Sequence, residues 1–334
     1  MSKRNSIILG MLFLILVVEI LIFAPNELGI SPAEDQAQQT AAAPPDQEKP
    51  GTGQVMSDVY SIEAKGENRE WELWADKALG PRNNKDEWTI QNVRVKFYAD
   101  NGVIYNVTGK TGYVAPMRND IRVVGNVITK SSNGYTFKTE SAFYESGKRR
   151  LSSPTAVTMS GPADDNGGPL TLNGGDLLAD FNTNEINITR AVKARKVVKN
   201  NKVATIQSSK AEFSGRTNMA RFLGNVVMDY DTMRVTGPEA RFMYDSKSRS
   251  LDSIEVAGGV RVTDTDKFAT SKSVSVSFKN ERTVFNGMPR VVQNGDELTG
   301  DQIVFLDGGR KVQVSNAKAD FDPESVQKSM EKKN

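Results

Sequence analysis

Alternation of apolar and polar residues limits the possible folds of this chain more than any other feature. From Val55 onward, alternating segments are separated by short polar turns. A period of two residues is typical of half-buried antiparallel strands. No helical period appears before the polar carboxyl-terminal tail, residues 323–334. The sequence therefore predicts an all-β fold built from antiparallel hairpins.

The alternating segments also repeat one another, with a period of roughly 30 residues. Each copy places Ala, Val or Ile shortly before an aromatic residue, and a polar turn follows. We interpret each copy as about one hairpin. The copies are Ala142-Phe143-Tyr144, Ala179-Asp180-Phe181, Ala211-Glu212-Phe213, Ala240-Arg241-Phe242, Val274-Ser275-Val276-Ser277-Phe278 and Ile303-Val304-Phe305.

The returning strands share a glycine at one position of the repeat, represented by Gly125, Gly224 and Gly258. Glycine inside a strand pattern usually marks a bulge or a bend, because it adopts positive φ freely. Hairpins that all bend at one position should stack into an open, twisted, two-layer sandwich with an apolar interior. Both ends of such a stack carry unpaired strands, to which another chain can add a strand.

The apolar positions that alternation turns inward have two interpretations. They form either the closed core of a sandwich or the lining of a lipid-binding groove, and the pattern alone does not separate these alternatives. The candidate groove residues are Leu73, Val95, Phe97, Val123, Val127, Phe137, Phe181, Phe213, Phe222, Val226, Phe242, Val256, Val260, Val276 and Ile303.

The absence of histidine and cysteine from all 334 residues argues against most catalytic chemistry. Cysteine nucleophiles, Ser-His-Asp triads and the usual zinc sites all need one of these residues. Acidic pairs such as Asp229 with Asp231 are better explained as turn residues. The net charge of +2 gives no reason to expect a nucleic-acid partner. We therefore predict no enzyme activity, no metal and no cofactor.

The amino terminus has the pattern of a membrane anchor. Lys3 and Arg4 precede an apolar stretch, residues 6–24, close to the ~20 residues that cross a ~30 Å hydrocarbon core. Basic residues in front place residues 1–5 in the cytoplasm. A cleaved signal peptide is the rival interpretation, but Pro25 follows Ala24 and no small-residue cleavage pattern closes the stretch. Residues 25–55 are rich in Ala, Pro, Gln and acidic residues, which predicts a flexible tether.

Two groups of charged residues also have alternative interpretations. Glu19 within the apolar stretch either reaches the membrane interface or faces a partner helix. A basic run contains Arg190, Lys193, Arg195 and Lys196. It is either a solvated strand face or a contact for lipid-headgroup phosphates or an acidic partner.

The Gly-Asn-Val strands and the Ala-x-aromatic hairpins resemble the OstA-like β-jellyroll of the lipopolysaccharide transport proteins LptA and LptC. The segment Trp71-Glu72-Leu73-Trp74-Ala75, together with the anchor and tether, is similar to LptC. A typical LptC ends after one jellyroll, whereas this chain continues. The resemblance implies an LptC-like jellyroll at residues 56–200 and an LptA-like jellyroll at residues 201–322.

The resemblance further implies a function and partners. A single-pass inner-membrane protein with a periplasmic ectodomain would receive lipopolysaccharide from the ABC transporter LptB, LptF and LptG. Acyl chains would then slide through the apolar groove toward the outer membrane. Strand addition at a jellyroll edge would join the chain to the transporter, with Val59, Ile62 and Trp71 as candidates, and to LptA or an LptA-like domain. The alternative is a membrane-anchored β-repeat scaffold without lipid cargo.

Overall fold

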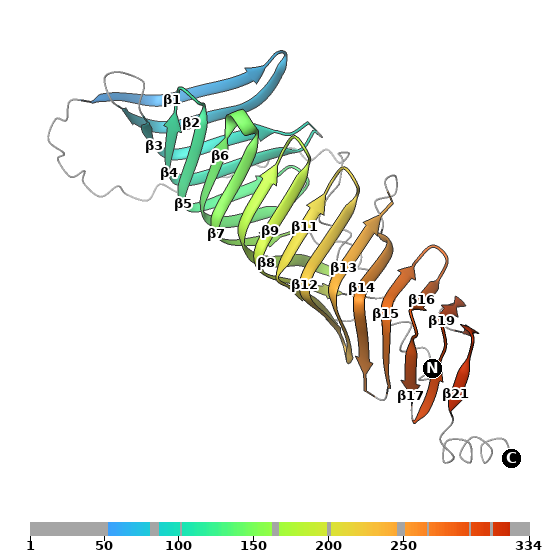
Figure 1. Ribbon diagram of the computed structural model, residues 1–334. Coiled ribbons are helices and arrows are strands. Elements are labelled where there is room, and N and C mark those ends of the chain that lie inside the picture. The colour runs from blue at the N-terminus through green and yellow to red at the C-terminus, as the bar shows by residue number, and fades with distance from the viewer. Residues whose placement is uncertain are drawn as a thin grey trace.

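The structure is a computed structural model in which one long, twisted body of antiparallel strands runs from β1 at one end to β20 and β21 at the other (Figure 1). It describes residues 53–80, 87–100, 102–161, 167–198, 202–245, 251–265, 267–293, 295–307 and 310–320. The prediction of an all-β fold is confirmed for these residues, since a single 3-10 turn, η3 (Ser146–Lys148), interrupts the strands.

The strands follow one another along the chain with short connections. The first nine are β1 (Gln54–Lys65), β2 (Asn68–Gly80), β3 (Trp88–Tyr98), β4 (Ile104–Ala115), β5 (Asp120–Ser131), β6 (Thr136–Glu145), β7 (Arg150–Ser160), β8 (Gly167–Asp180) and β9 (Glu185–Val198). The others are β10 (Val203–Ser208), β11 (Lys210–Ser214), β12 (Met219–Tyr230), β13 (Met233–Tyr244), β14 (Leu251–Asp264), β15 (Lys267–Ser277), β16 (Arg282–Asn286), β17 (Arg290–Gln293), β18 (Asp296–Thr299), β19 (Gln302–Leu306), β20 (Lys311–Ser315) and β21 (Lys318–Asp320).

All strands belong to one antiparallel sheet, in which β1 to β9 pair in sequence order. Strand β9 pairs with both β10 and β11, and these pair in turn with β12. Near the carboxyl end β15 pairs with β16 and β17, after which the pairing continues as β16–β19–β20 and β17–β18–β21. The two predicted blocks are thus joined by ordinary strand pairing at β9.

The long strands bend near their middle, so that the sheet forms two facing layers, and the short strands β10, β11, β16 and β17 each lie in one layer. Layer A contains the strand halves that pair, directly or through neighbouring strands, with β11 and β16. Layer B contains the halves that pair in the same way with β10 and β17. The register shifts near Gly125, Gly224 and Gly258, and all three have positive φ (80°, 75° and 93°). The predicted bend at this glycine position is confirmed.

A row of left-handed residues marks the same bend in successive repeats. Asp58, Asn92 and Asn126 are evenly spaced in the sequence, as are Ala191, Asn225 and Gly259, and all have positive φ. Asn, Asp and Gly are the residues that tolerate this conformation best. Ala191, at φ 49°, is the exception in this row.

Replacing Ala191 by glycine should therefore stabilise the protein. The left-handed conformation costs an L-residue with a Cβ roughly 1–2 kcal/mol, and glycine avoids it. After the entropic penalty of glycine, we expect Ala191→Gly to raise the free energy of unfolding by about 0.5–1 kcal/mol in denaturant titrations. The control is Ala156→Gly, at an exposed strand position without positive φ, which should lower stability. Equal losses in both variants would contradict this account.

The interior between the layers consists of two hydrophobic clusters. The first gathers side chains of β2 to β6, from Trp71 to Tyr144. The second runs from Tyr135 on the β5–β6 connection to Ile303 on β19 without a break at residue 200. Rings from opposite layers meet inside, as between Phe97 and Tyr144, whose centroids are 4.7 Å apart. The blocks therefore share part of one core.

The outward face of layer A in the second block carries a cross-strand ladder of ion pairs. Glu212 and Glu239 both bind Arg221, at 3.0 and 2.9 Å. Glu239 also binds Arg241 at 2.7 Å, and Arg241 approaches Glu255 at 3.4 Å. These side chains are partly exposed, so each pair contributes little stability. The ladder does leave each of these arginines with a carboxylate partner.

The predicted anchor at residues 6–24, with Glu19, and most of the predicted tether lie outside the described residues. Among the residues that the structure describes, no helix is both long and apolar enough to cross a membrane.

Candidate functional site

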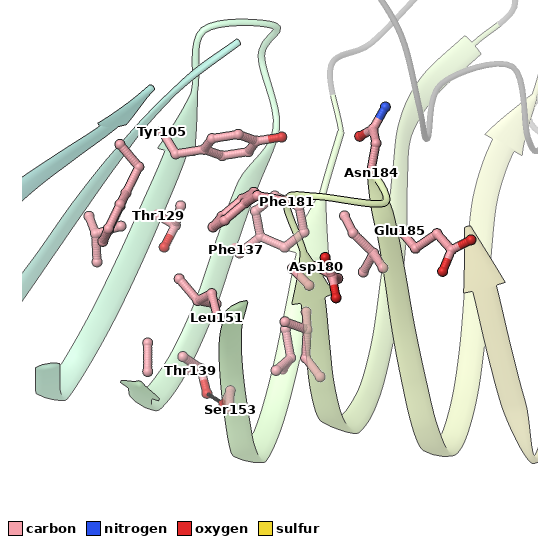
Figure 2. A pocket seen from close by; sticks show the side chains of 17 residues that line it. Tyr105, Thr129, Phe137, Thr139, Leu151, Ser153, Asp180, Phe181, Asn184 and Glu185 are labelled. Carbon is pink, nitrogen blue, oxygen red and sulfur yellow. Dashed lines mark hydrogen bonds between the residues drawn. The ribbon is translucent and has the colours of Figure 1, made fainter. Parts of the chain in front are cut away.

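A cleft opens into the interior where the two hydrophobic clusters meet (Figure 2). Its volume is about 760 Å³, including space open to solvent. Leu151 packs against both clusters, Phe137 against the second and Phe181 against the first. The lining residues come from β3 to β9: Phe97, Tyr105, Val107, Thr129, Phe137, Thr139, Ala142, Leu151, Ser153, Val157, Leu177, Ala179, Asp180, Phe181, Asn184, Glu185 and Ile186.

Aromatic rings form one wall of this cleft. Phe181, which follows β8, lies 6.3 Å from Tyr105 of β4 and 6.0 Å from Tyr144 of β6, measured between ring centroids. Burial raises the pKa of Tyr105, and it raises the pKa of Tyr144 to about 12. Both phenols therefore stay neutral at physiological pH. The wall is apolar and suited to hydrocarbon.

Hydroxyl groups lie at one side of the cleft and satisfy one another. The Thr139 hydroxyl is 2.7 Å from those of Ser153 and Thr155, and it donates to the carbonyl of Ala156 at 3.0 Å. Figure 2 shows Thr139 and Ser153 side by side below Leu151. Ser153 is only 2 % exposed. Because these groups are hydrogen-bonded, an apolar ligand can pass them without leaving a buried hydroxyl unpaired.

Asp180 lies at the mouth of the cleft and is held by three donors. Arg150 Nε donates at 2.7 Å, and the backbone N–H groups of Asn182 and Thr183 donate at 2.9 and 3.2 Å. Burial raises the pKa of Asp180, but these hydrogen bonds outweigh it and hold the pKa below its ordinary value. The carboxylate therefore fixes the turn after β8 that carries Phe181.

The lowered pKa predicts how stability depends on pH. A carboxyl with a depressed folded-state pKa stabilises the fold above its unfolded pKa of about 4, and loses that contribution as pH falls through the folded value. We expect Asp180→Ala to cost about 1–3 kcal/mol at pH 7, because charged hydrogen bonds are lost. The cost should shrink below pH 4. Unfolding titrations at pH 7 and pH 3 measure it, and a cost that is equal at both would contradict the assignment.

A second, smaller cleft opens in the carboxyl-terminal block, with a volume of about 510 Å³ including open space. Its lining is largely apolar, and Asp264 and Lys267 approach to 3.9 Å among the lining residues. The rings of Phe285 and Phe305 pack at 5.7 Å between centroids. An apolar cleft thus occurs in each predicted block. The lining residues are Met233, Val262, Asp264, Lys267, Phe268, Ala269, Thr283, Phe285, Val291 and Phe305.

The predicted groove residues all belong to the interior. Phe97, Phe137 and Phe181 line the first cleft, while most of the others lie in closed packing. Phe222 and Phe242 are both 0 % exposed, with ring centroids 5.5 Å apart. Leu73, Val95, Val123 and Val127 belong to the first cluster, and Phe213, Phe222, Val226, Phe242, Val256, Val260, Val276 and Ile303 to the second.

The predicted docking residues do not all lie on the edge. Val59 and Ile62 lie on β1, which has a free edge in the described sheet, and Ile62 is 46 % exposed. Trp71 differs, because it lies on β2 between β1 and β3 and is only 3 % exposed. Its indole N–H donates to the Glu63 carboxylate of β1. Trp71 thus lies inside the sheet and stabilises the edge strand β1 through this hydrogen bond.

The predicted basic run divides into three environments. Lys193 and Arg195 are exposed on the outward face of β9, whereas Arg190 pairs with Asp176 at 3.3 Å. Lys196 differs from the expectation of an accessible cation, because it is fully buried. It follows Val192 and Ala194 in the inward alternation of β9, between Leu170 and Ala204 of the neighbouring strands. This alternation was the signal in the sequence that identifies Lys196 as inward-facing.

The arrangement is suited to holding an apolar chain. Among the described residues, no group of three or more metal-ligating side chains gathers. The walls of the first cleft are mostly hydrocarbon, and the side chains of Thr139, Ser153 and Asp180 in its lining are engaged in the hydrogen bonds described above. Such a surface binds an apolar chain by burying its methylene groups, and each buried group contributes about 0.8 kcal/mol to the binding free energy.

Two family models match successive parts of the chain. A family model described as lipopolysaccharide-assembly, LptC-related, matches residues 20–197. A model described as LptA/(LptD N-terminal domain) LPS transport protein matches residues 205–313. A search of curated proteins found no match. Among solved structures, the chain is similar to LptH, the LptA homologous periplasmic component of the lipopolysaccharide transport device from Pseudomonas aeruginosa. The identity is 17%, with 36% of this chain and 95% of that chain covered and a TM-score of 0.32.

Proposed function

Because this chain belongs to the LptC-related family of lipopolysaccharide-assembly proteins, we propose that it carries lipopolysaccharide across the periplasm. It receives the lipid from the inner-membrane ABC transporter, LptB, LptF and LptG, and passes it toward the outer membrane. The observation that carries this proposal is the apolar cleft between the layers, lined by Phe97, Phe137 and Phe181. The chain supplies a path for acyl chains and performs no covalent chemistry.

The proposal assigns one jellyroll to residues 56–200 and a second to residues 201–322. The two family models, which end at 197 and begin at 205, support this division. The cleft of about 510 Å³ in the second block supports a continuous route. Strand pairing of β9 with β10 and β11 joins the routes without a gap in the sheet. An acyl chain leaving the first block thus finds a second apolar interior on the same body.

We assign the attachment to the membrane to residues 6–24, with residues 1–5 in the cytoplasm and residues 25–55 as a tether. The ectodomain then lies in the periplasm. The apolar composition of this stretch and the basic residues before it support the assignment. Glu19 is then placed against a membrane helix of the transporter, or at the interface.

We assign docking to the two free edges of the described sheet. At the amino end, β1 exposes Val55, Met56, Tyr60 and Ile62, by 59, 45, 54 and 46 %. A long strand with apolar side chains and a free edge favours strand addition. We assign this edge to the transporter. The edge of β20 and β21 is then the site for LptA or an LptA-like domain.

A scaffold without cargo is the second candidate, and one observation favours it. Phe222, Phe242 and Ile303 are 0 % exposed, so the middle of the second block is closed. Under the transport proposal the layers separate there when lipid passes. Under the scaffold proposal they stay closed.

Transfer of lipid onto the full chain tests the proposed function. Vesicles that contain the transporter and this chain are supplied with lipopolysaccharide and ATP, and the chain is then purified. We expect lipopolysaccharide to accompany the chain when ATP is present, and not when a non-hydrolysable analogue replaces it. No lipid on the chain, with normal ATP hydrolysis by the transporter, would support the scaffold.

A further inference from the structure

Strand register brings together cations that are far apart in the sequence. On the outward face of layer B, one row of paired residues contains Arg94, Lys138 and Lys193. The neighbouring row contains Lys96, Lys130 and Arg195. We call these six residues the cationic stripe. Between them the rows hold uncharged residues, which are Ile128, Thr108, Thr158, Asn173, Asn106, Thr136, Ser160 and Thr171.

Carboxylates are scarce along the stripe, and the one that the register sets beside it is Glu72, next to Lys96 at the amino-terminal end. Among the residues that the structure describes, none of its six cations takes part in an ion pair, although the ammonium group of Lys96 lies 5.8 Å from the Trp74 ring. Glu72 accepts hydrogen bonds from Tyr98 and Arg69 at 2.9 and 2.8 Å, and Lys96 adds only a weaker attraction to this carboxylate. Two outward arginines of layer B in the second block do have carboxylate partners: Arg234 pairs with Asp229 at 2.6 Å and Arg290 with Glu297 at 2.6 Å.

The contrast indicates that the stripe faces an anion outside this chain. Exposed like charges on adjacent strands repel one another, and an external anion would relieve this repulsion among the six cations. Lys193 and Arg195 belong to the stripe, whereas Arg190 and Lys196 do not, because one is paired and the other buried. The stripe lies on the outer face of the sheet, away from the cleft, so acyl chains inside the body do not contact it.

Aromatic and aliphatic residues extend the same face at its amino-terminal end. Tyr60 and Trp74 are paired across β1 and β2, with ring centroids 5.5 Å apart. Tyr60 is 54 % exposed, and Ile62, two residues further on the same face, is 46 % exposed. Trp and Tyr beside Lys and Arg are typical of surfaces at the membrane–water interface. An acidic protein surface explains the cations but not this aromatic end.

We propose that the cationic stripe docks the first block onto an anionic bilayer surface through lipid headgroups. With strands ~4.8 Å apart, the face from β2 to β9 extends over about 34 Å and offers a broad contact. A chain of about 30 residues without regular structure has an end-to-end distance of roughly 30 Å, so the inference rests on the tether and anchor proposed above, which would hold this face within reach of the bilayer. This contact goes beyond the proposed lipid transport, since it involves the resting bilayer and not the cargo.

The absence of cysteine allows a direct test with single labels. Thr158→Cys places a fluorophore on the outward face of layer B, between Lys138 and Asn173 in the register. Leu178→Cys places one on the outward face of layer A, on the adjacent strand β8, where Leu178 is 37 % exposed. The full chain is reconstituted in vesicles of phosphatidylcholine with increasing phosphatidylglycerol and a headgroup-linked quencher, without lipopolysaccharide or ATP. We expect anionic lipid to quench the Thr158 probe and leave the Leu178 probe unchanged.

Charge variants identify the groups responsible. Each cation near an anionic surface contributes about fivefold in affinity, so replacing Lys130, Lys138, Lys193 and Arg195 by Gln should lower the docked-to-free ratio by about 600-fold. The matched control replaces Arg221, Arg234, Arg241 and Arg290 by Gln and removes the same charge from paired positions. The proposal would be overturned if quenching of the Thr158 probe did not depend on anionic lipid, or if it persisted in the stripe variant. So would a stripe probe that responds only to the transporter, since this would assign the stripe to an acidic protein.

Discussion

Replacing Phe222 by alanine is expected to lower the free energy of unfolding by about 3–5 kcal/mol, as truncation of a buried aromatic ring typically does. The ring is 0 % exposed and packs edge-on against Phe213 and Phe242, at 6.0 and 5.5 Å between centroids. No neighbouring strand can fill the space without moving the ladder. Denaturant titration followed by far-ultraviolet circular dichroism measures the loss.

The control for Phe222→Ala is its neighbour on the opposite face of β12. Arg221 is partly exposed and bound to Glu212 and Glu239. Arg221→Ala should cost about 1 kcal/mol, because partly exposed ion pairs contribute little. Since the second cluster extends from Tyr135 to Ile303, hydrogen exchange should also rise in β7 to β9. Equal losses in both variants would argue against a closed interior at Phe222.

Filling the first cleft is expected to reduce lipid binding at least tenfold. Ala142 lines the cleft on β6 and is 6 % exposed, so the ring of Ala142→Phe would occupy space otherwise open to an acyl chain. Excluding as few as two methylene groups removes about 1.6 kcal/mol of burial, which is more than tenfold in affinity. Lipopolysaccharide recovered with the purified chain after ATP-driven transfer is the measurement.

The matched variant for Ala142→Phe is Ser152→Phe. Ser152 lies on the outward side of β7, paired with Phe143, and adds the same ring outside the cleft. It should leave lipid recovery unchanged. A thermal melt checks that both variants are folded. Normal recovery from folded Ala142→Phe would show that acyl chains do not use this cleft.

Local patterns in the sequence were sufficient to predict the strands and their bend. Alternation identifies the inward set, such as Phe222 and Val256, because strand side chains alternate between faces. The bend at Gly125, Gly224 and Gly258 follows from the tolerance of glycine for positive φ. Neither conclusion requires knowing which strands pair.

Features that depend on the pairing of distant strands could not be predicted. The cleft arises because β3 to β9 bring Phe97, Phe137 and Phe181 together from two layers. The cationic stripe arises because the register aligns Arg94 with Lys138 and Lys193, which are far apart in the chain. Lys196 shows the opposite case. Its inward position follows from its alternation with Val192 and Ala194, although its charge and its place in a basic run favour an exposed face.

Photo-crosslinking at two adjacent residues of β7 tests the central proposal most directly. Leu151 lines the first cleft and contacts both hydrophobic clusters, whereas the next residue, Ser152, is on the outward side. Each is replaced by a photo-crosslinking amino acid in the full chain, in vesicles that contain the transporter. The account predicts ATP-dependent lipopolysaccharide adducts at Leu151 and none at Ser152. No adduct at Leu151, with the protein folded and the transporter active, would contradict it.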